Sequence, residues 1–127
     1  MGSIGSAASA FDQLGGMSTV NKLASGFVNS SIKDPRLSAL TAGRSVDAAA
    51  STAKVSDQLC SILGGGCKAP FTDAQLSSAA GKLSPEQSKA LSDNFSSTLN
   101  SLASNPAVRD AVTKSIGSKL GGLGGLL

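Results

Sequence analysis

Apolar residues recur every three or four positions along most of the chain, and no stretch shows the apolar–polar alternation of a strand. Glycines, prolines and capping residues divide this pattern into segments. The pattern predicts helices over about residues 4–14, 18–34, 36–42, 46–63, 72–80, 85–102 and 106–120. Breaks are expected near Gly15, Pro35, Gly64 and Pro106. The sequence therefore predicts an all-α bundle of about six helices.

The two ends of the chain differ from this helical part. In the last predicted helix, Val108, Val112, Ile116 and Leu120 recur at intervals of four residues, and residues 121–127 contain only Gly and Leu. Such a tail is flexible in composition but adhesive at its leucines. We divide the chain into an N-terminal extension (1–10), a helical domain (11–120) and a C-terminal tail (121–127).

Composition excludes several classes of chemistry. Hydrophobic residues make up 40% of the chain and charged residues 15%, which favours a globular protein over a disordered one. The sequence has no His, so Ser-His-Asp and Cys-His catalysis and His ligation of zinc or haem iron are excluded. A net charge of +3 without a basic run, and without Trp or Tyr, does not support nucleic-acid binding.

Motifs for catalysis and targeting are weak. Ser30–Lys33 and Ser51–Lys54 have the Ser-x-x-Lys spacing of a nucleophile pair, but such matches arise by chance in a serine-rich chain. The acidic residues are scattered, and no close carboxylate pair suggests acid–base catalysis. We expect no enzymatic activity. No apolar stretch is long enough for a transmembrane helix, and no signal peptide is recognisable, as would also hold for a processed chain.

Two cysteines flank a glycine-rich turn. Cys60 and Cys67 are separated by Ser-Ile-Leu-Gly-Gly-Gly, which can fold back and bring the sulfurs together. A structural disulfide fits an even cysteine count in a small domain of an oxidising compartment. A redox-active pair and a metal-binding pair remain alternatives, although the spacing is not Cys-x-x-Cys and no other soft ligand is available.

Several pieces of the chain are specific through their order and spacing: Phe-Asp-Gln-Leu-Gly-Gly at 11–16, Val20 and Phe27, Asp-Pro-Arg-Leu at 34–37, the Cys-pair segment at 59–67, Leu76 with Ala79 and Leu83, and Phe95 with Leu99. Together they resemble the group I truncated haemoglobins, with Leu76, Ala79 and Leu83 similar to the haem-binding helix. The resemblance extends over about residues 11–120 and includes a Cys-pair variant of the family's glycine segment that occurs in exported bacterial members. The resemblance implies a truncated-globin fold.

The resemblance also shows what this chain lacks. The family's proximal His falls at Ala80, and its distal tyrosine falls at Val28. The aromatic pair that packs on haem falls at Leu40 and Thr41. A methyl group cannot ligate iron, so we expect no haem and no other cofactor.

An empty globin pocket would cost roughly 24 cal/mol per Å³, so aliphatic side chains are expected to fill it. A surface with sparse charge permits close packing of copies. We therefore expect a haem-free, self-assembling structural protein outside the bacterial cytoplasm, as an oligomer or filament. Its contacts would be made by residues 1–10 and by Leu120, Leu123, Leu126 and Leu127. The alternative is a globin-like binding module for a small apolar ligand, or for haem held by Met17 or a cysteine.

Overall fold

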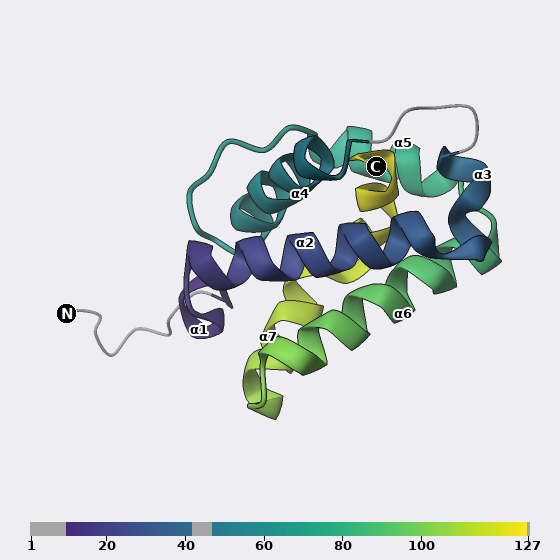
Figure 1. Ribbon diagram of the computed structural model, residues 1–127. Coiled ribbons are helices and arrows are strands. Elements are labelled where there is room, and N and C mark those ends of the chain that lie inside the picture. Colours follow the sequence, from purple (N-terminus) through teal and green to yellow (C-terminus); the bar gives the residue numbers. More distant parts are fainter. Residues whose placement is uncertain (1–9, 42–46, 127) are drawn as a thin grey trace.

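The computed structural model describes residues 10–41 and 47–126. The regular secondary structure of this part of the chain consists of helices and includes no strand (Figure 1), which confirms the all-α prediction. The α-helices are α1 (Ala10–Leu14), α2 (Met17–Lys33), α3 (Ser38–Thr41), α4 (Ala48–Ile62), α5 (Asp73–Gly81), α6 (Pro85–Leu102) and α7 (Pro106–Ile116). Two 3-10 segments, η1 (Pro35–Leu37) and η2 (Gly117–Leu126), complete it.

The predicted helix boundaries hold where capping chemistry is strong. Ser84 caps α6 by accepting a hydrogen bond from the backbone N–H of Gln87, whose side chain accepts one from Ser84 N–H in return. Thr72 and Gln75 form the same reciprocal box at α5. Each box satisfies two N–H groups that a helix start otherwise leaves without a partner. All four predicted breaks are present.

The last helix is shorter than its apolar spacing predicted. We expected it to continue to Leu120, but α7 ends at Ile116 because Gly117 adopts φ 49° and ψ −129°. This positive φ is accessible to glycine and strained for other residues. The chain therefore leaves the axis of α7 and continues as η2.

Helix α2 lies at the centre of the bundle and packs against α4 and α6. Phe27 of α2 and Phe95 of α6 meet edge to face, with ring centroids 5.9 Å apart. A Cβ on Gly26 would lie 2.5 Å from Cγ2 of Thr98, so glycine lets these two helices approach closely. The fully buried side chains around them are mostly aliphatic.

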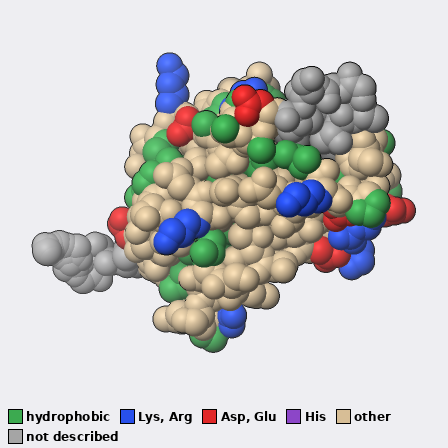
Figure 2. Space-filling view, in the orientation of Figure 1, with side chains coloured by type: hydrophobic (Ala, Val, Ile, Leu, Met, Phe, Trp, Pro, Cys, Tyr) green, Lys and Arg blue, Asp and Glu red, His purple; other side chains and the backbone are tan. Residues whose placement is uncertain are grey.

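The surface is largely neutral. On the face shown in Figure 2, most charged side chains stand apart, with neutral polar groups and backbone between them. None of the described helices has the length and apolar character needed to span a membrane.

Candidate functional site

The C-terminal segment η2 lies along α5 of its own chain. It also contacts α4, α6 and α7, and in Figure 1 it is the yellow segment between α4 and α5. A Cβ added to Gly121 would lie 3.1 Å from Cβ of Ala80 and 3.6 Å from Cδ1 of Leu83. The backbone of the tail therefore rests on the part of α5 to which the resemblance assigns the proximal haem ligand.

The next residue makes an even closer approach. A Cβ on Gly122 would lie 2.6 Å from the carbonyl oxygen of Leu76 and 2.7 Å from its Cα. Real Cβ atoms do not come so near to backbone, so only glycine fits here. The two consecutive glycines thus give the tail its fit to α5. The Gly-Gly pair is the sequence signal for this contact, although the composition of the tail by itself predicts a flexible segment.

One of the four leucines predicted to contact other copies, Leu123, lies in the core of its own chain in this structure. Leu123 is fully buried and belongs to the same core as helices α2 and α6, so it is not available at the surface of this fold. Leu120 is half-buried and packs against that core. Of the other predicted contact residues, the side chain of Leu126 and all of residues 1–9 and 127 lie outside the described part. The helices of its own chain already bury the side chain of Leu123 in this structure.

Two opposing effects act on the docked tail. Burial of Leu123 favours docking, whereas ordering a glycine-rich backbone opposes it. Segment η2 has 10 residues, whereas 3-10 runs beyond three or four residues are uncommon. An exposed ion pair between Lys119 Nζ and Asp73 Oδ1, 3.5 Å apart, adds little. We therefore expect the tail to open more readily than the long helices.

On this face of α5, the position to which the resemblance assigns the proximal haem ligand carries an alanine. Ala80 offers no ligand atom, and Gly121 occupies the space directly beside it. Val28, at the expected distal position, is fully buried in the core. Leu40 and Thr41 lie in α3, but their side chains are not among those described. Met17 is half-buried against the core at the start of α2.

The cysteines form the predicted disulfide. Cys60, in α4, and Cys67 are joined, with their Cα atoms 5.5 Å apart. A Cβ on Gly65 would lie 2.6 Å from both Cys60 Sγ and Cδ1 of Phe11, so the bridged turn packs tightly against α1. Because both sulfurs are bonded to each other, neither is a thiolate that can hold iron or another metal in this state.

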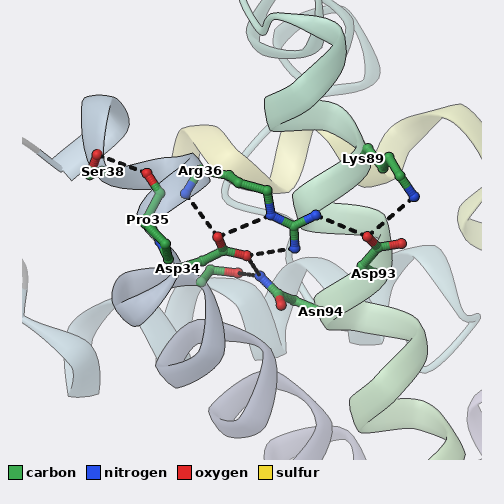
Figure 3. A network of polar contacts seen from close by, with 8 residues as sticks. Asp34, Pro35, Arg36, Ser38, Lys89, Asp93 and Asn94 are labelled. Carbon is green, nitrogen blue, oxygen red and sulfur yellow. Dashed lines mark hydrogen bonds and ion pairs between the residues drawn. The ribbon is translucent and has the colours of Figure 1, made fainter.

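A polar network that the sequence did not reveal joins η1 to α6 (Figure 3). The Arg36 guanidinium donates from Nε to Oδ1 of Asp34 at 3.1 Å, from Nη2 to Oδ2 of Asp34 at 2.9 Å, and from Nη1 to Oδ2 of Asp93 at 3.1 Å. Asn94 Nδ2 donates to Oδ2 of Asp34 at 3.1 Å. Lys89 Nζ lies 3.5 Å from Oδ2 of Asp93 and forms an exposed ion pair with it. The sequence predicts only a break near Pro35, a short helix from Arg36 and a family resemblance at 34–37.

The two carboxyl groups of this network, those of Asp34 and Asp93, are held in their charged form. Hydrogen bonds from Arg36 lower the pKa of Asp34 to about 2, and they also lower the pKa of Asp93. Both carboxylates are therefore ionised at neutral pH, and neither is suited to donate a proton as a general acid. The network ties the turn after α2 to the side of α6.

The two Ser-x-x-Lys matches do not assemble into a site. Ser51 is buried in α4, whereas Lys54 is exposed. Ser30 and Lys33 are both exposed near the end of α2. The residues that the structure does bring together at α5 are Ala80, Leu76 and the tail glycines, and these carry no reactive group.

Comparison with solved structures supports the same fold. The chain is similar to truncated hemoglobin from Tetrahymena pyriformis in its Fe(III) form, in the unmodified protein and in two single-residue mutants. In each case the TM-score is 0.71 and the sequence identity 21%, covering 86% of this chain and 92% of the other. No protein-family model and no curated protein matches the sequence. The fold of this chain is that of a truncated globin.

Proposed function

We propose that this chain is a haem-free, non-enzymatic globin-like protein that serves as a self-assembling structural subunit outside the cytoplasm. The observation that carries the proposal is the contact between Gly121 and Ala80. In this arrangement the chain's own tail, rather than a cofactor, fills the space beside α5. The protein then acts through its polypeptide surfaces.

Two further features support a structural role. Sparse, separated charges leave little repulsion between copies. The Cys60–Cys67 bridge supports an oxidising compartment, where such bonds persist. The Asp34–Arg36–Asp93 network supports a rigid subunit, since it links two elements that are distant in sequence.

The test is to purify the oxidised chain, record its absorption spectrum as isolated, and measure its mass by light scattering over a wide range of concentration. The proposal expects no haem band and a mass that rises with concentration, with oligomers or filaments in electron micrographs. A chain that stays monomeric at high concentration would contradict the structural role. A haem band in the isolated protein would contradict the haem-free assignment.

A further inference from the structure

We propose that η2 is an exchangeable segment: it leaves the face of α5 that it covers in its own chain and docks against the same face of a second copy. The inference rests on the proposed self-assembly and supplies its mechanism. The binding site is the face of α5 that Gly121 and Gly122 now cover, and its ligand is the tail of another copy. The site then requires residues from two chains.

The first support is the fit between η2 and the face of α5 that it covers. Gly121 lies against Ala80 and Gly122 against the backbone of Leu76, at separations that admit no Cβ on either glycine without a shift. This face of α5 therefore contacts a backbone without side chains at 121 and 122, and the fully buried leucine at 123 follows. A second copy carries the identical segment, so it forms the same contacts.

The second support is the hinge at Gly117. This residue ends α7 with φ 49°, and a Cβ placed on it would have no atom within 4 Å. The chain can therefore change direction here without disturbing packed neighbours or α7 itself. Because η2 is the last described segment, its departure draws no other described element out of the fold.

The third support is the weak internal structure of the segment. Because 3-10 runs longer than three or four residues are uncommon, the 10-residue, glycine-rich η2 depends on its contacts with α5 for its conformation. Exchange replaces each intrachain contact by the same contact between chains, which makes it a low-cost route to association. Reciprocal exchange closes a dimer, whereas exchange with a different copy at each end continues as a filament.

The main experiment places one thiol on each side of the contact, in separate chains. Ala80→Cys is introduced into one chain and Gly121→Cys into another, with the native disulfide intact. The two chains are mixed, allowed to oxidise mildly and analysed without reductant. A Cβ on residue 121 would lie 3.1 Å from that of residue 80 in the docked state. The two positions therefore need to move apart by a few tenths of an ångström to reach the separation of about 3.5–4.5 Å that a disulfide spans.

The matched control replaces Gly121→Cys by Ser101→Cys, at an exposed position on α6. Exchange predicts a covalent heterodimer in about tenfold higher yield than in the control mixture, because docking holds the two thiols at high effective concentration. Peptide mapping should place the bond between positions 80 and 121. Equal yields in the two mixtures would overturn the proposal.

A second pair of variants avoids the packed contact, in case either cysteine variant folds poorly. Asp73→Lys in one chain and Lys119→Asp in the other each place like charges within their own chain, and opposite charges face each other only between the two chains. Both residues lie at the surface, with side-chain exposures of 82% for Asp73 and 38% for Lys119. At low salt the mixture should form heterodimers roughly two- to fivefold more often than each variant alone forms homodimers. A statistical mixture would count against exchange.

A single chain with both Ala80→Cys and Gly121→Cys separates this inference from the proposed function. Locked by an intrachain bond, this chain should no longer assemble, and reductant should restore assembly. If the locked chain assembles as the parent does, exchange is wrong and the structural role stands. If the parent is monomeric and the mixed chains do not cross-link, both are wrong.

Discussion

Gly121 lies directly against Ala80, so that a Cβ on the glycine would stand 3.1 Å from the alanine Cβ. One residue is in the tail and the other is near the end of α5. Their contact places peptide backbone beside the position to which the resemblance assigns the proximal haem ligand. The fold is thus completed by the chain's own C-terminal segment, and this has measurable consequences.

The glycine at 122 should be irreplaceable for docking. Gly122→Ala puts a methyl group against the backbone of Leu76, where separations of 2.6–2.7 Å leave no room. We expect a loss of about 1–3 kcal/mol in the free energy of unfolding, typical of overpacking. Urea titration measures it. Gly81→Ala is the control, because that helical position has open space and should be neutral or stabilising by up to about 1 kcal/mol. Equal effects of the two substitutions would contradict the docked geometry.

Leu123 should hold the tail in place. Leu123→Ala removes the fully buried side chain of η2. We expect a loss of about 2 kcal/mol, the low end for Leu→Ala, since the tail can undock instead of enclosing a cavity. Trypsin should then cut faster after Lys119, and mass spectrometry of the fragments follows this rate. Leu120→Ala, at a half-buried position, serves as the milder control. An unchanged cleavage rate in Leu123→Ala would argue against Leu123 as the anchor.

The disulfide should stabilise the fold by closing a short loop. Cys60 and Cys67 are seven residues apart, and closing a loop of this size in the unfolded chain is worth about 2–3 kcal/mol. Cys67→Ser should therefore lower the free energy of unfolding by that amount. Thermal unfolding of the oxidised parent, the reduced parent and the variant measures it. Two free thiols in native, unreduced material would contradict the assignment to an oxidising compartment.

Asp34 should make the fold sensitive to acid. Its pKa is about 2 in the folded protein, below the ordinary value of 3.8, because Arg36 hydrogen-bonds to the charged form. The unfolded chain therefore binds a proton first. The stabilisation is complete above about pH 4 and is lost as the pH falls toward 2.

Urea unfolding at a series of pH values tests this acid dependence. Asp34→Asn should be less stable at neutral pH and should lose less stability than the parent between pH 4 and 2. Asp57→Asn, at an exposed position of α4, is the control and should follow the parent. An unchanged acid dependence in Asp34→Asn would show that other carboxylates dominate.

The sequence predicted features that depend on neighbours along the chain. The helix starts near residues 72 and 85 and the break at Pro35 depend on residues within one or two turns, so their patterns were sufficient. The disulfide was predictable for the same reason, since its loop is short.

Long-range contacts were not predictable in this way. Arg36 and Asp93 are 57 positions apart, and only the fold brings them together. The tail shows the same limit. Apolar spacing suggested that α7 continues to Leu120, but it cannot show that Gly117 turns the chain back toward α5. The sequence likewise predicted contacts of Leu123 with other copies and could not show that Leu123 lies in the core of its own chain in this structure.

We propose that the tail, and not haem, fills the space beside α5, and titration of the intact oxidised chain with haemin tests this most directly. The absorption of the Soret band is followed in the parent and in Ala80→His, with and without residues 121–127. We predict no saturable change in the parent, little in Ala80→His because Gly121 blocks the new side chain, and binding only when the substitution is combined with removal of the tail. A sharp, tight, one-to-one Soret shift in the intact parent chain would contradict it.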